Sequence, residues 1–255
     1  MYLSSLLIET GSNPDRPRPG RLWLRNVYRV HQRLCMAFPS GERPGNDPDF
    51  LKPYAPADFA QAHVHVKRSA NAGFLFRIDP QPGGRAVILV LSALRPDWDY
   101  AFHNADYLLA GPAQCKPFEP RASAGQRYRF RLLANAVYRA TAKSRHSSGE
   151  PVRPEWIGKR IGVGSDAGSL RAWLERRAAA AGFSVSALTL AQGGWVYMNK
   201  SSRAGGGQRL RSIRYEGLLQ ITDAQKFCAA LTCGIGPGKA FGFGLLSIAP
   251  APAGS

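Results

Sequence analysis

The chain has 255 residues, of which 34 are lysine or arginine and 17 are aspartate or glutamate, so its formal net charge is +17 at pH 7. Its hydrophobic content of 44% is enough for real cores, and its length suits one large or two small domains. No long apolar span or basic amphipathic anchor stands out, so no membrane partner is expected. The charge predicts a polyanionic partner, with nucleic acid as the leading candidate. A source organism whose proteins are generally rich in arginine would also explain this net charge.

Cysteine usage and the first residues bear on the location of the protein. The four cysteines are scattered, with no Cys-x-x-Cys pair and no zinc spacing, so neither disulfides nor a zinc site are expected. A reducing compartment, the cytoplasm, is therefore the expected location. Residues 2–8 lack the basic region and the long apolar region of a signal peptide, which argues against secretion.

The chain begins with a predicted strand and a predicted helix. The strand covers residues 2–9, and a Pro- and Arg-rich insert follows at residues 13–20. Residues 22–38 predict a helix, because apolar residues recur along it at spacings of three and four. The residues that should face the core are Val27, Val30, Leu34 and Phe38. The helix should end at Pro39, and residues 40–62 should form an exposed loop.

Two further strands are predicted at residues 74–78 and 86–91, with a turn at Pro82-Gly83-Gly84 between them. The order of strand, helix, strand and strand is how a ferredoxin-like half begins. The second helix of this half is not obvious, and residues 97–109 are ambiguous.

A shift in composition to Pro, Lys and Gly between residues 114 and 125 predicts a domain boundary, and hence domains of residues 1–120 and 121–255. The second half again predicts a strand, a helix, strands, a helix and a strand. The expected strands are 127–133, 183–190, 195–198, 209–221 and 241–249, and the expected helices are 166–181 and a short one from 223. The fold class is therefore α+β, with tandem ferredoxin-like (RRM-like) domains and antiparallel sheets.

Positive charge is concentrated in parts of this second half. Residues 127–133 alternate between arginine and apolar residues, so the arginines should face away from the core. The outward set is Arg127, Arg129 and Arg131, and the inward set is Tyr128, Phe130 and Leu132. Residues 139–160 are polar and basic and predict a mobile loop, and residues 200–208 form a second basic segment.

Residues 234–244 are the most informative part of the chain, because five of the eleven are glycine and a single lysine, Lys239, lies in the middle. Glycine at this density lets a backbone turn sharply and lie close to a ligand, with N–H groups toward an anion. A Walker A loop does not fit, since Cys233 and Ala240 occupy positions that need glycine and Ser or Thr, and no Gly-x-Gly-x-x-Gly frame fits either. A glycine-rich connection before an edge strand is the simpler interpretation.

His31 is the best candidate for chemistry. It follows Tyr28 by three residues on the predicted helix, so the two side chains share a face beside the apolar stripe. An imidazole and a phenol in such a place can transfer protons, although a boundary histidine with one hydrogen bond fits the same pattern. His63 and His65 alternate as a metal pair would, but no third ligand is evident, and surface histidines are the simpler interpretation.

The absence of two residue patterns also limits the reactions that we expect this protein to catalyse. No nucleophilic triad and no carboxylate cluster for Mg²⁺ is evident, so a nuclease of this kind is expected to work without a metal or another cofactor. That condition selects RNA, because its 2′-OH is a built-in nucleophile.

Several stretches from residue 1 to about residue 250, taken in order, carry a common resemblance. They are Met1-Tyr-Leu-Ser4, Tyr28-Arg-Val-His-Gln-Arg-Leu34 with Phe38-Pro39, Phe74-Leu-Phe-Arg77, Pro96-Asp-Trp98, Phe130-Arg-Leu-Leu-Ala-Asn135, and residues 234–244 with Leu245-Leu246. In this register they resemble the CRISPR repeat-processing endoribonucleases of the type I-E Cascade complex, the CasE (Cse-three) group.

The resemblance implies two ferredoxin-like domains that bind the stem-loop of the CRISPR repeat RNA, cut it at the 3′ base of the stem without a metal, and keep the product alongside other Cascade subunits. It implies that His31 is the general acid or base and that Tyr28 aligns the attacking 2′-OH. The products would carry a 2′,3′-cyclic phosphate and a 5′-hydroxyl. A basic hairpin near residues 200–214 would enter the RNA groove.

The residues that we expect to contact RNA come from this hairpin, from the glycine-rich segment and from the outward face of residues 127–133. They are Lys200, Arg203, Arg209, Arg211, Gly236, Gly238, Lys239, Arg129 and Arg131. Leu133 stands where relatives often have arginine, so one contact is expected to be missing or moved. Two other functions remain open, namely a non-catalytic RNA-binding subunit of the same superfamily and a general basic RNA-binding protein.

Overall fold

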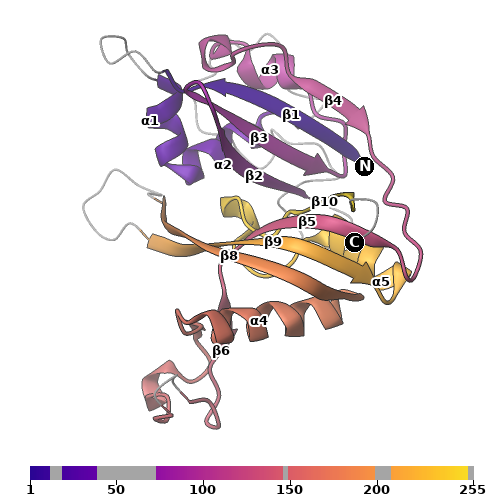
Figure 1. The fold of residues 1–255 in the computed structure, drawn as a ribbon. Coiled ribbons are helices and arrows are strands. Elements are labelled where there is room, and N and C mark those ends of the chain that lie inside the picture. Colours follow the sequence, from indigo (N-terminus) through magenta and orange to yellow (C-terminus); the bar gives the residue numbers. More distant parts are fainter. Residues whose placement is uncertain (12–18, 39–72, 146–148, 199–207, 252–255) are drawn as a thin grey trace. The chain divides into compact units, whose positions relative to one another are not determined.

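The computed structural model describes residues 1–11, 19–38, 73–145, 149–198 and 208–251 (Figure 1). The chain divides into two compact units. The first consists mainly of Met1–Glu119, and the second mainly of Pro120–Val196 and Arg209–Lys239. Each unit has a four-stranded sheet of its own.

The first unit has the strand order of a ferredoxin-like fold. Its elements are β1 (Tyr2–Glu9), α1 (Pro19–Arg25), α2 (Val27–Cys35), β2 (Phe74–Gln81), β3 (Arg85–Ser92), α3 (Trp98–Phe102), a 3-10 turn (Asp106–Leu108) and β4 (Gln114–Pro117). The sheet order is β2-β3-β1-β4, and every neighbouring pair is antiparallel. In register, Tyr2 of β1 lies opposite Ser92 of β3 and Pro117 of β4. The first and fourth strands in sequence are therefore neighbours, as the split βαβ pattern requires.

The single helix predicted for residues 22–38 is wrong in one respect, because it is broken at Asn26 into α1 and α2. Asn26 has an extended backbone, and its side-chain oxygen accepts a hydrogen bond from the backbone N–H of Tyr28. A side chain that satisfies one of the unpaired N–H groups at a helix start also ends the helix before it. The predicted apolar stripe is confirmed. Its buried members are Val27, Val30, Leu34 and Phe38.

The ambiguous stretch at residues 97–109 contains the second helical part of this unit. Asp97 caps α3 by accepting a hydrogen bond from the N–H of Tyr100 at 2.9 Å, and the 3-10 turn follows. The chain then returns along β1 as β4. The composition shift that predicted the domain boundary thus begins inside a strand, at Gln114, because Pro, Lys and Gly are tolerated in a short edge strand.

The second unit has the same order in its main sheet, with several longer elements and an added two-stranded ladder. They are β5 (Arg127–Ala134), β6 (Val137–Arg139), a 3-10 turn (Pro154–Trp156), β7 (Arg160–Gly162), α4 (Ala167–Ala180), β8 (Phe183–Met198), β9 (Gln208–Ile221), α5 (Ala224–Cys233), a 3-10 turn (Lys239–Phe241) and β10 (Leu246–Pro250). The main sheet has the order β10-β5-β9-β8, so β10 is the edge strand that the apolar run predicted.

One long strand replaces the two strands predicted at residues 183–190 and 195–198. Gly193 and Gly194 lie in the predicted gap, and both belong to β8. A Cβ at Gly193 would come within 2.9 Å of the Ser212 hydroxyl on β9, so this glycine allows a close approach of the two strands. Strand β10 also begins later than predicted, at Leu246.

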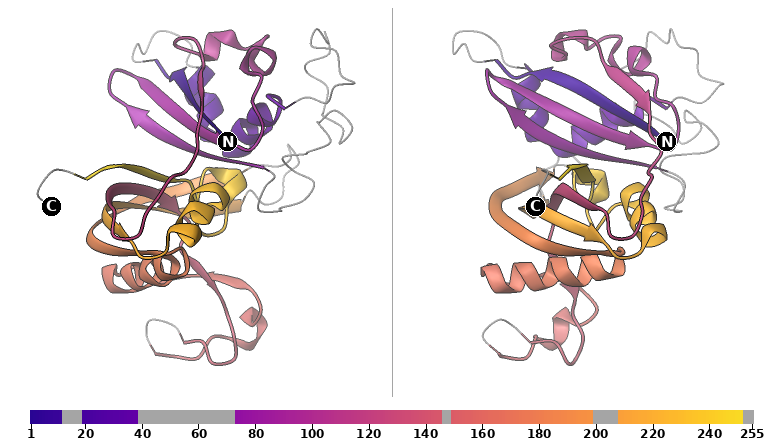
Figure 2. Two further views of the ribbon diagram at one scale, coloured as in Figure 1. Left: turned by 90° about the vertical axis from the view of Figure 1, so that its right-hand side faces the viewer. Right: turned by 45° about the vertical axis from the view of Figure 1, so that its right-hand side comes forward.

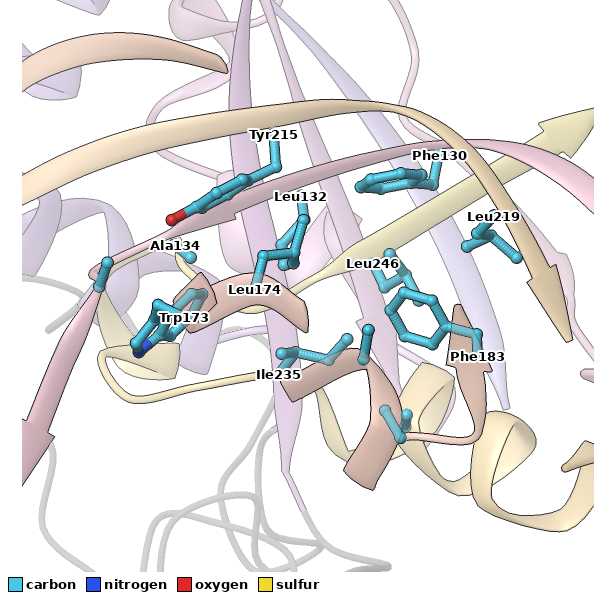
Figure 3. Close-up of a cluster of buried hydrophobic side chains, with 14 of the residues drawn as sticks. Phe130, Leu132, Ala134, Trp173, Leu174, Phe183, Tyr215, Leu219, Ile235 and Leu246 are labelled. Atoms are coloured by element: carbon cyan, nitrogen blue, oxygen red, sulfur yellow. The ribbon is translucent and has the colours of Figure 1, made fainter. Parts of the chain in front are cut away.

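The core of the second unit lies between its main sheet and α4 and α5 (Figures 2 and 3). The Trp173 ring on α4 stacks on Tyr215 of β9 with centroids 5.8 Å apart, and its Nε1 donates to the Val137 carbonyl at 3.0 Å. Asp166 caps α4, and Asp223 caps α5. Other large side chains that fill this core are Phe130, Leu132, Leu174, Phe183 and Leu219.

The segment predicted as a mobile loop at residues 139–160 is closed at its base by a two-stranded ladder. Strands β6 and β7 pair antiparallel, with Val137 opposite Gly162. The Arg139 side chain donates to the Gly158 carbonyl at 3.0 Å, and Val152 is buried. The described part of this segment is therefore an ordered excursion between β5 and α4 (Figure 1).

Candidate active site and nucleic-acid interface

His31 projects from α2 onto two aromatic rings of β2. Its ring centroid lies 5.3 Å from that of Phe74, and 6.2 Å from that of Phe76 with the planes 22° apart. Phe74 and Phe76 are two residues apart on one strand and therefore point to the same face. The residue is partly exposed while its Nδ1 is buried, so the ring is held against an apolar floor at the margin of the core.

Tyr28 lies one turn before His31 on the same helix face and is also partly exposed. Its backbone N–H donates to Asn26 at 3.2 Å, which fixes the residue in the first turn of α2. The two predicted catalytic residues are thus placed on a short, capped helix at the edge of the core.

Arg33 ties α2 to the second helical part of the unit. Its Nη1 donates to the Ala101 carbonyl at 2.9 Å and to the Asn104 side chain at 3.0 Å. Phe38, just beyond α2, also meets the Trp98 ring edge-on, with centroids 6.5 Å apart. These contacts fix the position of the helix that carries His31.

Cys35 lies one turn after His31 on α2, and its thiol has a packing role. The Sγ of Cys35 donates to the His31 carbonyl at 2.8 Å, and burial raises the pKa of this thiol above its usual value. A thiol that stays protonated is a poor nucleophile. Cys35 therefore supports the helix and does not offer covalent chemistry.

The glycine-rich segment requires its glycines for conformational reasons. The five positive-φ residues are Gly234, Gly236, Gly238, Gly242 and Gly244. The N–H of Ile235 donates to the Gly244 carbonyl and the N–H of Gly244 donates to the Leu133 carbonyl, each at 2.8 Å. These hydrogen bonds join the two ends of the segment to each other and attach Gly244 to β5. The amides of Ile235 and Gly244 are used within the protein, while Gly236, Gly238 and Lys239 remain partly exposed.

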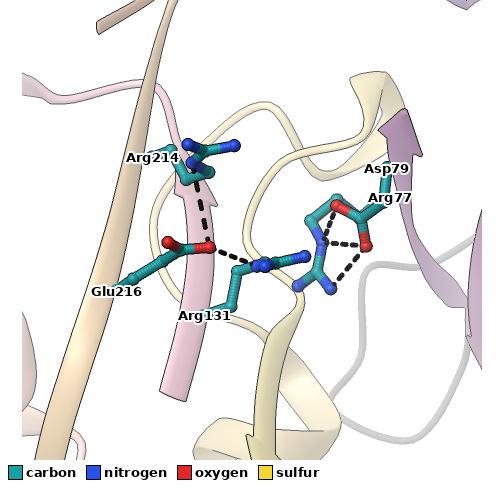
Figure 4. A network of polar contacts seen from close by, with 5 residues as sticks. All are labelled: Arg77, Asp79, Arg131, Arg214 and Glu216. Atoms are coloured by element: carbon teal, nitrogen blue, oxygen red, sulfur yellow. Dashed lines mark hydrogen bonds and ion pairs between the residues drawn. The ribbon is translucent and has the colours of Figure 1, made fainter. Parts of the chain in front are cut away.

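The outward face of β5 is basic, as the alternation predicted. Arg127, Arg129 and Arg131 are exposed, while Phe130 and Leu132 are buried and Tyr128 is partly buried. Arg131 forms an ion pair with Glu216 of β9, and the same carboxylate lies 3.8 Å from the Nε of Arg214 (Figure 4). One carboxylate serves two guanidinium groups, so the face keeps a net positive charge.

Figure 4 also draws a different kind of arginine, in the first unit. The Arg77 side chain is only 3% exposed, and its Nε and Nη2 donate to the two carboxylate oxygens of Asp79 at 2.8 to 3.0 Å. A buried bidentate pair of this type is compensated within the protein. Arg77 is therefore a structural residue.

The hairpin of β8 and β9 carries two of the predicted contacts, and they differ. The guanidinium of Arg211 donates to the Val163 carbonyl, so it is partly used to hold the chain before α4. The guanidinium of Arg209 lies over the exposed ring of Trp195, 4.6 Å from its centroid. Trp195 was not predicted, although an aromatic residue beside a basic segment is a recognised signal of nucleic-acid binding. Lys200 and Arg203 lie outside the described residues.

The described residues also bear on metal binding and on membrane insertion. Within that part of the chain, no three His, Cys, Asp or Glu side chains gather as a metal site would require. His63 and His65 lie outside it. None of the helices in the described ranges is long and apolar enough to cross a membrane.

Comparison with known proteins agrees with the fold. A family described as CRISPR associated protein matches residues 1–250. The chain is 30% identical over 265 aligned residues to the CRISPR-associated endoribonuclease Cse3 of Thermus thermophilus, and the match covers 98% of this chain and all of the relative. This chain belongs to the Cse3/CasE family of CRISPR-associated proteins. The CasE subunit of the Escherichia coli Cascade system is 27% identical, with the same coverage.

Solved structures of the family have the same fold. Thermus thermophilus Cse3 bound to an RNA that represents a pre-cleavage complex gives a TM-score of 0.65 at 26% identity, over 98% of both chains. A structure of Cse3 bound to a 19-nucleotide RNA gives 0.66 at 29% identity, over 98% of this chain and all of that one. The fold of the Escherichia coli protein Cas6e is also similar, with a TM-score of 0.58 at 24% identity. Tandem ferredoxin-like domains are thus confirmed.

Proposed function

We propose that this chain is an endoribonuclease that binds the stem-loop of CRISPR repeat RNA, cleaves the precursor at the 3′ base of the stem, and keeps the product as a subunit of a Cascade complex. Its full-length relative in Thermus thermophilus is named an endoribonuclease, and solved relatives hold RNA. The observation that carries the proposal is the partly exposed imidazole of His31, held on Phe74 and Phe76 by a short capped helix. Such an RNA substrate places the protein in the cytoplasm.

The proposed reaction is a transesterification by the RNA itself. The 2′-OH beside the cut attacks the phosphorus, and the bond from phosphorus to the 5′ oxygen breaks. The products are a 2′,3′-cyclic phosphate and a 5′-hydroxyl, so one proton leaves the 2′ oxygen and one reaches the 5′ oxygen. His31 handles the proton at one of these two oxygens, and Tyr28 aligns the 2′-OH. Holding the nucleophile in line with the leaving group supplies much of the remaining acceleration.

The proposal divides the work between two domains. Residues 1–120 carry catalysis, through α2. Residues 121–255 carry RNA binding, through the hairpin of β8 and β9, the glycine-rich segment and the outward face of β5. The basic residues proposed to contact RNA here are Arg129, Arg131, Arg209, Arg211 and Lys239, with Lys200 and Arg203 beyond the described residues. Their charge accounts for binding that weakens with salt.

Incubation of the purified protein with its cognate repeat hairpin in EDTA, followed by end-group analysis, tests the proposal. Cleavage at the base of the stem with a cyclic phosphate and a 5′-hydroxyl is expected. A second hairpin, with a deoxyribose at the cleavage position, should bind equally well and remain intact, because it lacks the nucleophile. Tight binding of the all-ribose hairpin without cleavage would point to a non-catalytic subunit, and equal binding of a scrambled stem to a general RNA-binding protein. Loss of cleavage in EDTA alone would show a metal requirement.

A further inference from the structure

The hairpin of β8 and β9 exposes a large aromatic side chain that nothing in the proposed reaction uses. Trp195 of β8 is 48% exposed, and the guanidinium of Arg209 lies over its ring at 4.6 Å. Tyr197, two residues along β8 and thus on the same strand face, is 56% exposed. Tryptophan is normally well buried in a folded domain. A half-exposed indole with a cation on its face therefore calls for a ligand.

The place of this pair in the sheet explains its exposure. Strand alternation puts Arg209, Arg211 and Tyr215 on one face of β9. At Tyr215 this face is covered by α4, because the Tyr215 ring is fully buried against Trp173. Arg211 lies next along the strand and donates to the Val163 carbonyl, just before α4. Arg209 and Trp195 lie further toward the end of the hairpin, where both side chains are exposed. The core side of the sheet thus continues into an open aromatic and cationic surface.

We infer that Trp195 and Arg209 form a stacking site for an unpaired base of the RNA that flanks the stem. An indole and a guanidinium both stack on the flat face of a nucleobase, and they do so with little preference for its identity. Bases inside an A-form stem are already stacked on one another, and its deep groove hides them, so a stacking site takes an unpaired nucleotide. The net charge of +17 favours this anionic ligand over an apolar patch of a protein partner.

This inference rests on the proposed function, because it assigns a further contact to the same RNA. It adds an RNA element outside the stem-loop and predicts that the protein distinguishes a hairpin with a single-stranded extension from a blunt one. The stem would be held by backbone charges, whereas the extension would be held by a ring face. Only the first of these two contacts is expected to weaken strongly with salt.

Three hairpins with a deoxyribose at the cleavage position test the stacking site. One is blunt, one has a short adenosine extension on its 5′ side, and one has the extension on its 3′ side, with 2-aminopurine in each extension. The wild-type protein should bind one extended hairpin about tenfold more tightly than the blunt one and should quench its 2-aminopurine. Trp195→Ala and Trp195→Leu should lose both effects, Trp195→Phe should keep most of each, and Arg209→Lys should lose part of each.

Tyr107→Ala provides the matched control, because Tyr107 is 61% exposed but belongs to the 3-10 turn of the first unit. It should leave the preference intact. Equal binding of all three hairpins by the wild-type protein, or a preference that survives in folded Trp195→Leu, would overturn the inference. Cleavage of the all-ribose hairpin with the 3′ extension is measured in parallel, because only this hairpin has a phosphodiester beyond the 3′ base of the stem. The absence of cleavage would contradict the proposed function, whereas cleavage without any preference for an extension would contradict only the stacking site.

Discussion

The two units place a helix at the same point of the same topology and use it differently. In the first unit, α2 follows the first strand and presents His31, partly exposed, to the rings of Phe74 and Phe76. In the second unit, α4 follows the first strand and presents Trp173, fully buried, to the ring of Tyr215. Both helices stack a flat side chain on an aromatic residue of the sheet.

The difference lies in what surrounds the stacked ring. Around Trp173 the apolar core is closed, and the indole N–H is satisfied by the Val137 carbonyl. Around His31 the helix is short, so the ring lies at the margin of the core, with exposed Gln32 next to it. We infer that one topology serves packing in the second unit and the proposed chemistry in the first, according to the length of the helix and the polarity of one side chain. Substitutions at either helix test this contrast.

His31→Ala should slow cleavage of the repeat hairpin by about 10²–10⁴-fold, because it removes a proton-transfer group. Binding of the hairpin should be unchanged, since the proposed RNA contacts lie elsewhere. Gln32→Ala, a change at the adjacent exposed position, is the control. Single-turnover cleavage and filter binding measure the two quantities. An unaltered cleavage rate would remove His31 from the reaction.

A bridging phosphorothiolate at the 5′ oxygen of the cleavage site separates the two proton-transfer roles. Sulfur leaves without being protonated, so this substrate should restore cleavage by His31→Ala if His31 is the general acid. A rate that stays low would assign His31 to the 2′-OH.

Trp173→Ala should lower the free energy of unfolding by about 3–5 kcal/mol, because it leaves a cavity in the closed core and removes a hydrogen bond to Val137. Thermal or urea unfolding measures this change. His31→Ala, with its partly exposed ring, should cost clearly less. Equal costs at the two positions would contradict the division between a packing helix and a catalytic helix.

Gly236→Ala should destabilise the second unit by roughly 1–2 kcal/mol, because Gly236 has φ of +82° and a Cβ there would lie 3.3 Å from the Trp173 ring. Gly111→Ala is the control, since a Cβ at Gly111 would meet nothing within 4 Å. Urea unfolding of both variants gives the comparison. In a Trp173→Ala background the cost of Gly236→Ala should fall, and a cost that does not fall would show that only the backbone conformation matters.

Arg129→Gln should lower the slope of log affinity for RNA against log salt concentration by about 1, which is the signature of one lost phosphate contact. Arg171→Gln is the control, because Arg171 is exposed on α4 and pairs with Glu175 at 3.6 Å. Binding titrations at several salt concentrations measure the slope. An unchanged slope for Arg129→Gln would separate this face of β5 from the RNA.

Asp166→Asn should remove a small part of the acid sensitivity of folding. Hydrogen bonds from Ser169 lower the pKa of the Asp166 carboxyl below its usual value of 3.8. The ionised Asp166 carboxylate therefore stabilises the folded protein fully above its usual pKa. This contribution is lost as the pH falls through the lowered pKa. Asparagine keeps a cap acceptor but does not titrate. Melting temperatures should thus decline less steeply below pH 4 in the variant, and parallel curves would contradict this role of Asp166.

Patterns of short period could be predicted from the sequence, because they depend on neighbouring residues. The alternation along β5 identified the outward Arg129 and Arg131, and the stripe beside His31 identified the buried face of α2. The break at Asn26 was missed, since apolar spacing continues across it and only the cap shows where α2 begins. The continuity of β8 was missed because Gly193 resembles a turn residue until Ser212 is seen beside it.

The pairing of Trp195 with Arg209 could not be predicted, since it depends on how two strands of a hairpin are placed side by side. The roles of Arg131 and Arg211 could not be predicted from the sequence for the same reason. The sequence identifies both residues only as basic. The fold shows that Arg131 pairs with Glu216 and that Arg211 donates to the Val163 carbonyl. Long-range partners decide which arginines are available to a ligand.

Strand β9 is one continuous strand that runs from an exposed end near Arg209 to a buried part near Tyr215 and Leu219. Amide hydrogens near Tyr215 and Leu219, which are fully buried, should exchange with solvent only when the whole second unit opens. Those near Arg209 should exchange by local fraying at the hairpin end. A base seated on Trp195 would therefore slow isotope uptake at one end of a single strand and leave the other end as slow as before.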